Sequence, residues 1–403
     1  MAVSLLPIAG LFSSKLRKGL SGRKNWRNQL KAARQNGDQP LAWFHCASLG
    51  EFEQGRPLIE AYRQRYPEHF ILLTFFSPSG YEIRKDYAEA DLVMYLPFDT
   101  QQNARDFIAL SKPAIAFFVK YEFWYNYLHA LKAQGVPAIS VSTILRRDHA
   151  ALDWYGEVPR QAIQCFTHFF TQNEETIETL KALGIRSVTL AGDTRFDRVS
   201  AIAEAQEPNA IAASFTDGSL TLIAGSVWKQ DLDVLLPAWE SIQNLKLIIA
   251  PHEIREEEIT ALVDRYGDEA VRITQVKDGE DLSKKRLLIV DTIGQLSSLY
   301  RYADIAYIGG AFGKGLHNIL EAATFGMPIC FGNQNYRKFA EAIDLIDRRV
   351  AHVIADQSEM QQVLQQLVAD TALREEQSKA SAEYVAAKRG ATLVIMEGIK
   401  KWL

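Results

Sequence analysis

The densest group of residues suited to chemistry is a glycine-rich segment at residues 309–321, GGAFGKGLHNILE. An apolar run ends at Ile308 and a helical pattern starts near His317, so the glycines predict a loop between a strand and a helix. Backbone N–H groups at such a helix start can bind a phosphate. Asn318 and Glu321 share one helical face, and a carboxylate there suits a ribose diol. The alternative is a turn that the glycines merely close, and the spacing fits neither a Walker P-loop nor G-x-G-x-x-G.

Two other segments place a glutamate directly after an apolar run. Glu51 follows Gly50 at the start of a predicted helix, where its carboxylate can accept a proton from an incoming hydroxyl. The alternative is that Glu51 complements the helix dipole. Glu122 lies in KYEFWYN, residues 120–126, whose carboxylate, aromatic rings and amide suit sugar recognition. Its alternative is a helix start with an aromatic core anchor.

The elements that must position these loops are short apolar runs that alternate with amphipathic helical patterns. This alternation predicts parallel sheets covered on both faces, with ligands bound at the carboxyl ends of the strands. Residues 225–226, 251–255 and 291–295 follow other strands and bring small, polar or basic groups to the same sheet edge. The predicted strands are 41–46, 71–76, 92–96, 114–119, 138–141, 168–171 and 188–191, then 220–224, 245–250, 287–290, 305–308, 328–331 and 352–354.

A break at residues 199–214, rich in Ala, Glu and Gln, separates two series of about six strands each. We therefore expect two Rossmann-like, doubly wound domains that face a cleft. The predicted division is a basic segment at 1–37, a first domain at 38–200, a linker at 201–214, a second domain at 215–380 and a final helix at 381–403.

Composition excludes several classes of protein. The 403 residues are 47% hydrophobic and 23% charged, which is typical of a globular chain. A net charge of -4 does not indicate a general nucleic-acid-binding surface. The three cysteines are far apart and, like the histidines and carboxylates, have no metal-site spacing. Asp231 and Asp233 match a metal-binding D-x-D, but we expect them inside a helix and reject that role.

The first 37 residues carry eight cations and no acidic residue. An apolar stretch at residues 5–12 precedes the cations, and Phe12, Leu16 and Leu20 repeat on one helical face. One interpretation is an interfacial segment that binds anionic lipid. The other is a solvated basic helix or an arm that docks within the fold.

Five motifs in this order resemble the 3-deoxy-D-manno-octulosonic acid (Kdo) transferases of lipopolysaccharide synthesis. The resemblance runs from about Gly22 to Lys388. The motifs are residues 47–51, 122–126, 192–197, 291–296 and the glycine-rich segment 309–321.

The resemblance implies a GT-B fold whose C-terminal helix crosses back to the first domain. It implies transfer of Kdo from CMP-Kdo to the lipid A precursor, with inversion and without a catalytic metal or other cofactor. Glu51 resembles the base that deprotonates the acceptor hydroxyl, and Glu122 and Arg195 match positions that stabilise the transition state. The CMP-binding residues implied are Ser226, Pro251, His252, Ile293, Gly294, Gln295, Gly313, Lys314, Gly315, His317, Asn318, Ile319, Leu320 and Glu321.

The same resemblance places the chain on the cytoplasmic face of the inner membrane, attached peripherally, with no nucleic-acid partner. The chain departs from the family where an arginine beside Pro251 is missing, where Arg195 replaces a common lysine, and where Lys120 replaces an acidic residue. Two alternatives stay open: a GT-B transferase or epimerase that uses another nucleotide sugar, and a nucleotide-binding protein without catalysis.

Overall fold

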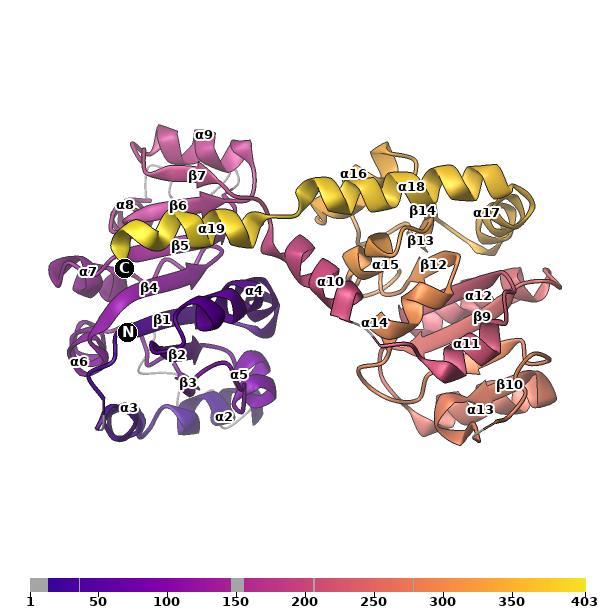
Figure 1. Cartoon of the computed structure of the whole chain (residues 1–403), viewed down its shortest axis with the longest axis horizontal. Helices are drawn as coiled ribbons and strands as arrows, with labels where there is room; N and C mark the ends of the chain where they lie inside the picture. Colours follow the sequence, from indigo (N-terminus) through magenta and orange to yellow (C-terminus); the bar gives the residue numbers. More distant parts are fainter. Residues whose placement is uncertain (1–13, 36, 146–155, 206, 278) are drawn as a thin grey trace. The chain divides into compact units, whose positions relative to one another are not determined.

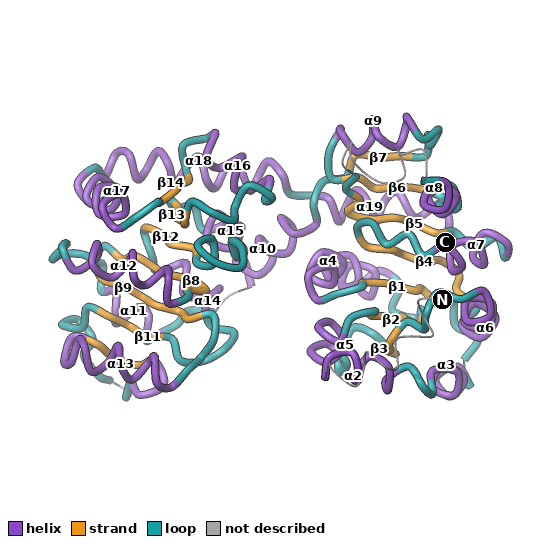
Figure 2. Tube along the Cα trace, turned by 180° about the vertical axis from the view of Figure 1, so that it is seen from behind, coloured by secondary structure: helices purple, strands orange, loops and turns teal. Residues whose placement is uncertain are grey.

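The protein folds into two α/β domains, each built on one parallel sheet (Figure 1). The computed structural model describes residues 14–35, 37–145, 156–205, 207–277 and 279–403. The first domain comprises Met1–Arg198 with Lys388–Leu403, and the second comprises Val199–Ala387. Within each domain, helices pack against the sheet (Figure 2). The predicted α/β class with two Rossmann-like, doubly wound sheets is confirmed.

The first sheet has seven parallel strands in the order β3-β2-β1-β4-β5-β6-β7. β1 and β4 are neighbours although β2 and β3 lie between them in the chain, so the strand order reverses between β1 and β4. Such a switch point leaves a crevice outside the carboxyl ends of the strands, where ligands bind in doubly wound sheets. The strands are β1 (Leu41–Cys46), β2 (Phe70–Phe75), β3 (Leu92–Tyr95), β4 (Pro113–Val119), β5 (Ala138–Thr143), β6 (His168–Thr171) and β7 (Val188–Leu190).

The second sheet also has seven strands, in the order β10-β11-β9-β8-β12-β13-β14, and its switch point lies between β8 and β12. The prediction of six strands missed β10 (Ala270–Arg272), because a three-residue edge strand has too short an apolar run to stand out. The other strands are β8 (Thr221–Val227), β9 (Lys246–Pro251), β11 (Leu287–Ile289), β12 (Ile305–Ile308), β13 (Ile329–Gly332) and β14 (Ala351–Ile354).

Two buried clusters cover the two faces of the first sheet. One joins the sheet to α3, α6, α7, α8 and α9, and the other joins it to α4 and α19. Burial on both faces explains why β1 is buried at every residue. The helices of this domain are α2 (Ser14–Gly22), α3 (Trp26–Arg34), α4 (Leu49–Arg65), α5 (Pro78–Arg84), α6 (Gln101–Ser111), α7 (Tyr125–Ala133), α8 (Glu157–Ile163), α9 (Glu174–Ala182) and α19 (Ala391–Ile399).

In the second domain a third cluster packs α12, α13 and α17 against the sheet. The helices of this domain are α11 (Ala210–Thr216), α12 (Lys229–Glu240), α13 (Glu256–Tyr266), α14 (Leu296–Leu299), α15 (Ile319–Thr324), α16 (Ala340–Asp347), α17 (Gln357–Ala369) and α18 (Thr371–Lys388).

Residues 201–214, expected as a linker, contain helices instead. α10 (Thr194–Ala205) crosses the boundary between the domains, and α11 starts at Ala210. Asn209 caps α11 by accepting from the Ala212 N–H, and its own N–H donates to Tyr302. The polar composition of this segment thus comes from a helix end and an N-cap.

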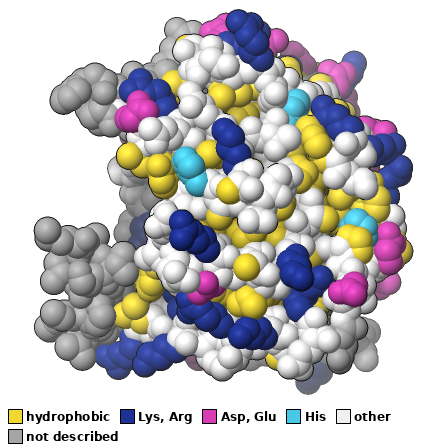
Figure 3. Space-filling view, turned by 90° about the vertical axis from the view of Figure 1, so that its left-hand side faces the viewer, with side chains coloured by type: hydrophobic (Ala, Val, Ile, Leu, Met, Phe, Trp, Pro, Cys, Tyr) yellow, Lys and Arg dark blue, Asp and Glu magenta, His cyan; other side chains and the backbone are white. Residues whose placement is uncertain are grey.

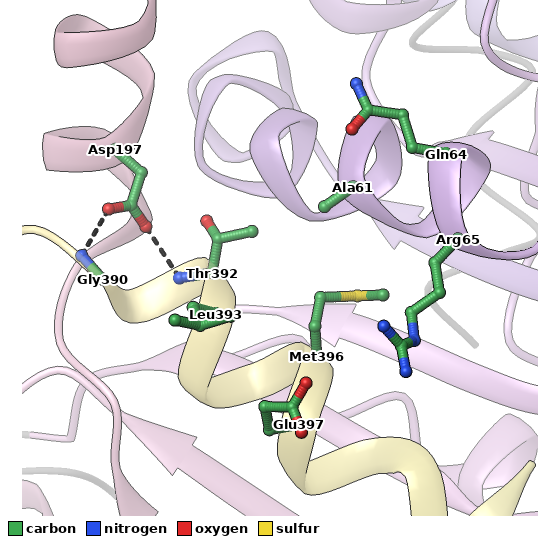
Figure 4. Close-up of a pocket in the computed structure, with 9 residues that line it drawn as sticks. All are labelled: Ala61, Gln64, Arg65, Asp197, Gly390, Thr392, Leu393, Met396 and Glu397. Carbon is green, nitrogen blue, oxygen red and sulfur yellow. Dashed lines mark hydrogen bonds between the residues drawn. The ribbon is translucent and has the colours of Figure 1, made fainter.

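The end of the chain returns to the first domain from Lys388, seven residues later than the expected 381. Asp197 of α10 caps α19 by accepting from the backbone N–H groups of Gly390 (2.6 Å) and Thr392 (2.7 Å), as Figure 4 shows. Ile395 and Ile399 then enter the core of the first domain. Two backbone donors on one carboxylate fix where this helix begins.

The basic N-terminal segment is partly an arm that docks within the first domain; its apolar stretch 5–12 lies outside the described residues. Trp26 and Leu30 are buried, and Arg23 is 8% exposed and donates to the carbonyls of Gly19, Phe76 and Leu96. Arg27 pairs with Asp106. Basic side chains are spread among apolar ones over the face drawn in Figure 3. None of the helices in the described parts of the chain has the length and apolar character needed to span a bilayer.

Candidate active site

Glu51 lies at the carboxyl end of β1, in the first turn of α4. Ser48 precedes the helix in an extended conformation, and the Glu51 carboxylate accepts hydrogen bonds from the Ser48 backbone N–H (2.7 Å) and hydroxyl (2.9 Å). These are the contacts of a capping box, which uses a carboxylate three residues into the helix. Glu51 is only 9% exposed. The carboxylate therefore has a fixed position and a helix N-terminus that favours its negative charge.

Glu122 lies at the carboxyl end of β4, the strand beside β1 across the switch point. Its Oε2 atom accepts from the Trp124 indole N–H at 2.8 Å. Burial, then the negative charge of Glu51, and a hydrogen bond to Glu51 raise the pKa of Glu122 to about 7. The structure thus brings together the two glutamates that the sequence placed in separate loops.

When two buried carboxyls share a site, one of them stays protonated to a higher pH than the other. Below pH 7 the proton resides on Glu122, which donates it in a hydrogen bond to Glu51. An ionised carboxylate beside a carboxyl of raised pKa is the arrangement that general acid–base chemistry uses.

Behind Glu122 lies a buried polar chain. The His45 Nε2 atom is 3.8 Å from Glu122 Oε2, and His45 Nδ1 is 2.8 Å from the Thr74 hydroxyl. The Trp43 indole N–H donates to the same hydroxyl at 2.8 Å. Burial lowers the pKa of His45 to about 3, so its imidazole is neutral. His45 was not predicted as a site residue, although it precedes Glu51 by only six residues.

Arg195 lies in the first turn of α10, and its guanidinium pairs with the buried Asp193. The Arg195 Nε atom is 2.8 Å from Asp193 Oδ2, and the Arg195 backbone N–H also donates to Asp193. The neighbouring Thr194 hydroxyl is 3.0 Å from that of Ser142, which has a left-handed φ of 50°. This segment therefore holds Arg195 on a well-bonded turn and leaves its side chain 30% exposed.

In the second domain the glycine-rich loop follows β12 and packs tightly on the end of β8. A Cβ atom on Gly309 would lie 2.4 Å from the Ser226 carbonyl oxygen, and one on Gly310 would lie 2.4 Å from the Gly315 oxygen. The N–H groups of Gly313 and Gly315 both donate to the Gly310 carbonyl. These two backbone donors close the loop on itself. The phosphate donors that the sequence suggested are the N–H groups at the helix start that follows the loop, and that role stays a prediction.

The loop is fixed by Asp231, which the sequence analysis considered only as a rejected metal ligand. Asp231 is 1% exposed and lies in the first turn of α12, as expected for a helical residue. Its Oδ2 atom accepts from the N–H groups of Trp228 (2.8 Å) and Gly310 (2.9 Å), and its Oδ1 atom accepts from the Tyr307 hydroxyl (3.0 Å). The capping spacing from Trp228 to Asp231 was the signal that could have identified this role.

Three rings from the ends of β8, β9 and β12 stack at the switch point of the second sheet. The His252 ring lies 4.5 Å from that of Trp228 and 4.3 Å from that of His317. The Trp228 indole N–H donates to His317 Nε2 at 3.1 Å, and Lys314 Nζ lies 4.6 Å from the Trp228 ring centroid. Burial, then the nearby His252, lowers the pKa of His317 to about 4. Trp228 had no distinguishing signal in the sequence.

The remaining predicted CMP residues differ in their surroundings. The helix α15 starts at Ile319 rather than near His317, because Asn318 is its N-cap. The Asn318 amide donates to Glu321 at 2.9 Å, so the two predicted ligand contacts bind each other here. Ser226 has a left-handed φ of 54°, and Ile293 is 92% exposed beside Gly294. Pro251 is half-buried.

Arg255 is exposed and pairs with Glu253 and Glu258 on the surface. Among the residues that the structure describes, no group of three or more His, Cys, Asp or Glu side chains is placed to hold a metal ion.

Comparison with known proteins finds similarity to Kdo transferases in sequence. Residues 24–198 match the family model described as 3-deoxy-D-manno-octulosonic-acid transferase (kdotransferase). The chain is 28% identical to the 3-deoxy-D-manno-octulosonic acid transferase of Bordetella pertussis, over 90% of this chain and 88% of that protein. It is 27% identical to the transferase of the same name from Aquifex aeolicus, over 73% of this chain and 76% of that protein.

Solved structures of low sequence identity share the two-domain fold. UDP-GlcNAc 2-epimerase from Neisseria meningitidis aligns with a TM-score of 0.62 at 14% identity, over 90% of this chain and all of that one. MurG from Acinetobacter baumannii aligns with a TM-score of 0.57 at 12% identity, over 90% of this chain and 99% of that one. The chain thus has a GT-B fold and is similar in sequence to Kdo transferases.

Proposed function

We propose that the protein transfers Kdo from CMP-Kdo to a hydroxyl of the lipid A precursor (lipid IVA) with inversion, releases CMP, and needs no catalytic metal. The observation that carries this proposal is the pair of buried glutamates at the switch point of the first sheet. A protein that only binds a nucleotide does not need a fixed carboxylate beside a carboxyl of raised pKa. Similarity to Kdo transferases supports Kdo as the sugar that is transferred.

In this mechanism Glu51 accepts the proton of the acceptor hydroxyl while that oxygen attacks the anomeric carbon of Kdo. The bond from that carbon to the CMP phosphate breaks, and CMP leaves with the electron pair. In the transition state positive charge develops on the sugar and negative charge on the departing phosphate. Ionised Glu122 is the proposed stabiliser of the positive charge, and Arg195 that of the negative charge. The chemistry requires Glu51 to be charged, and its place at a helix N-terminus supports that state.

We assign CMP to the second domain, at the carboxyl ends of β8, β9 and β12. His252, Lys314 and Asn318 are exposed there and supply polar and cationic groups beside the stacked rings. Lys314 and the Ser226 hydroxyl are the proposed partners of the single phosphate, whose low charge makes a divalent cation unnecessary. Asn318 and Glu321 would exchange their mutual hydrogen bond for contacts to the nucleotide.

We place the protein on the cytoplasmic face of the inner membrane through its basic N-terminal segment. Arg17, Lys18, Lys24 and Lys31 are exposed, while Arg23 and Arg27 contact the first domain. Exposed cations near an anionic bilayer contribute about 1 kcal/mol each. Sedimentation with anionic and with neutral vesicles tests this, and equal binding to both would contradict it.

The transfer itself is tested with tetraacylated lipid A precursor and CMP-Kdo made in situ, with EDTA and without added metal. Mass spectrometry of the lipid should show the addition of one or more Kdo units. No addition, with UDP protecting the protein against heat better than CMP, would indicate another nucleotide sugar. If no Kdo is added but CMP still protects the protein against heat, the proposed nucleotide site is supported and the proposed acceptor is contradicted.

A further inference from the structure

His45 is a fully buried polar side chain with one ring nitrogen unused. It is 0% exposed in β1, one residue before the end of the strand. Within the described part of the chain, its Nε2 atom has no hydrogen-bond partner. A buried polar atom without a partner costs free energy, so a protein that keeps one at its active site has a use for it.

Thr74 can bond to His45 in either tautomer of the imidazole. The Trp43 indole N–H can only donate, so the Thr74 oxygen accepts from it at 2.8 Å. The hydroxyl keeps a second lone pair and one proton. It can donate to His45 Nδ1 at 2.8 Å, or accept from Nδ1–H and donate to the Phe44 carbonyl at 3.3 Å. The first arrangement uses the shorter of the two donor contacts and puts the proton of the neutral imidazole on Nε2.

This Nε2–H group faces Glu122. The distance from His45 Nε2 to Glu122 Oε2 is 3.8 Å, too long for a hydrogen bond but short enough to close by a small movement of the carboxylate. The ring itself is fixed, because Trp124 meets it edge-on at 5.6 Å and Phe118 at 6.0 Å. The same Oε2 atom already accepts from the Trp124 indole.

We propose that His45 is a positioning residue of the active site, whose Nε2–H donates to the Glu122 carboxylate when the acceptor hydroxyl replaces Glu122 as the partner of Glu51. Glu122 then loses the hydrogen bond to Glu51 and releases its proton to solvent water, so that Glu51 remains the unprotonated base. The Glu122 anion is held by two N–H donors, those of His45 and Trp124. This deepens the proposed function, because it assigns how Glu122 becomes the anion that stabilises the transition state.

The groups that titrate or carry charge around this pair come from several elements. Glu51 of α4 faces Glu122, and the Cys46 thiol of β1 lies in the field of both glutamates. Arg23, between α2 and α3, acts on His45 and disfavours its protonation. His45 therefore serves as a neutral donor across the working pH range, and the group that titrates is Glu122.

Two substitutions separate this role from a structural one. In His45→Gln the side-chain amide can place an N–H near the position of Nε2, while Thr74 turns its proton to the Phe44 carbonyl. In His45→Asn the shorter amide can still accept from Thr74 but cannot reach Glu122. Both variants keep a polar group in the same buried site, so they are matched for packing.

We expect His45→Gln to retain kcat within about threefold of the native chain. His45→Asn should lose about tenfold in kcat at pH 7, with KM for CMP-Kdo unchanged, and the acidic limb of its pH profile should move up by about one unit. The acidic limb moves to higher pH because the Glu122 carboxylate loses a hydrogen-bond donor, which disfavours its charged form. Equal losses in both variants, with no movement of the acidic limb, would overturn the proposal.

A second readout is independent of transfer activity. Carbon-13 NMR of glutamate-labelled protein, with the Glu122 signal assigned by its disappearance in Glu122→Gln, follows the titration directly. The titration should move to higher pH in His45→Asn and stay near the native one in His45→Gln. An unchanged titration in His45→Asn would overturn the role of His45. A native chain without Kdo transfer would overturn the proposed function while leaving this measurement interpretable.

Discussion

The polar residues at the switch point of the first sheet are carboxyls among aromatic rings, whereas those of the second are histidines and an indole above a glycine-rich loop. Both groups follow neighbouring strands at the point where the strand order reverses. Burial acts on them in opposite directions. It raises the pKa of Glu122 to about 7 and lowers that of His317 to about 4.

Near neutral pH, burial therefore favours the uncharged form of Glu122 in the first domain and of His317 in the second. An uncharged carboxyl beside Glu51 preserves a base for a proton transfer, because two adjacent carboxylates would repel each other. A neutral His317 is held by the Trp228 indole, and we propose that it offers directed hydrogen bonds to the nucleotide. The fold is repeated, and under the proposed function the chemistry is divided between the two copies.

The largest effect on stability is expected from Glu122→Gln. The carboxyl is protonated in the folded state up to about pH 7 but loses its proton near pH 4.5 when unfolded, so the free energy of unfolding falls as pH rises between these values. At about 1.4 kcal/mol per pKa unit, the penalty at pH 8.5 is on the order of 3 to 4 kcal/mol. Urea unfolding should show Glu122→Gln more stable than the native chain at pH 8.5 and closer to it at pH 5.

Glu68→Gln is the control for this experiment, since Glu68 is 64% exposed in the same domain. It should change the stability little at either pH. Equal stability of the native chain and Glu122→Gln at pH 8.5 would show that Glu122 is not held protonated.

The next effect concerns Asp231→Asn in the second domain. Three donors converge on this buried carboxylate, and an amide in its place presents N–H groups to at least one of them. The loss should be about 2 kcal/mol in the free energy of unfolding. CMP affinity should fall about tenfold, because Gly310 and the loop lose their anchor.

Asp233→Asn is the matched control, because Asp233 is exposed in the same helix α12. Calorimetric titration with CMP should leave it unchanged. Equal CMP affinity in both variants would separate the glycine-rich loop from the nucleotide site.

A smaller, opposite pH dependence is expected from His317. Its pKa is about 4 in the folded state and near 6.5 when unfolded, so its contribution to stability is present above pH 6.5 and is lost as pH falls toward 4. His317→Gln, which cannot gain the proton, should flatten the fall in melting temperature of the second domain between pH 6.5 and 4.5. A steeper fall in His317→Gln would contradict the lowered pKa.

The smallest effect is expected from Arg255→Ala. Arg255 is 54% exposed and pairs at the surface with Glu253 and Glu258. Surface pairs contribute little, so the melting temperature should move by less than about 1 °C. CMP affinity should change less than about twofold. A tenfold loss of CMP affinity would instead place this arginine in the site, in the role of the family's missing arginine.

The sequence predicted most of the fold because buried parallel strands are short apolar runs between turn residues, as β1 and β12 illustrate. β10 was not predicted because a strand of three residues at a sheet edge has no such pattern. Residues 201–214 were misjudged because caps and helix ends share the composition of linkers.

The site was harder to predict because its contacts depend on strand order. Glu51 and Glu122 were each recognised, but their pairing follows from the adjacency of β1 and β4, which no local pattern specifies. Asp231 was visible as a helix residue, yet its contact with Gly310 arises only when β8 and β12 lie side by side. Trp228 and His45 acquire their roles in the same way.

The most direct test of the proposed function compares the native chain with Glu51→Gln in two measurements on the same preparations. One is Kdo transfer to the lipid A precursor, read by mass spectrometry, and the other is CMP affinity, read by calorimetry. The account predicts a loss of transfer of about 10²- to 10⁴-fold, as expected for a general base, with CMP affinity unchanged. Transfer that persists in Glu51→Gln would contradict the assignment of the base, and a parallel loss of CMP affinity would contradict the division of chemistry between the two domains.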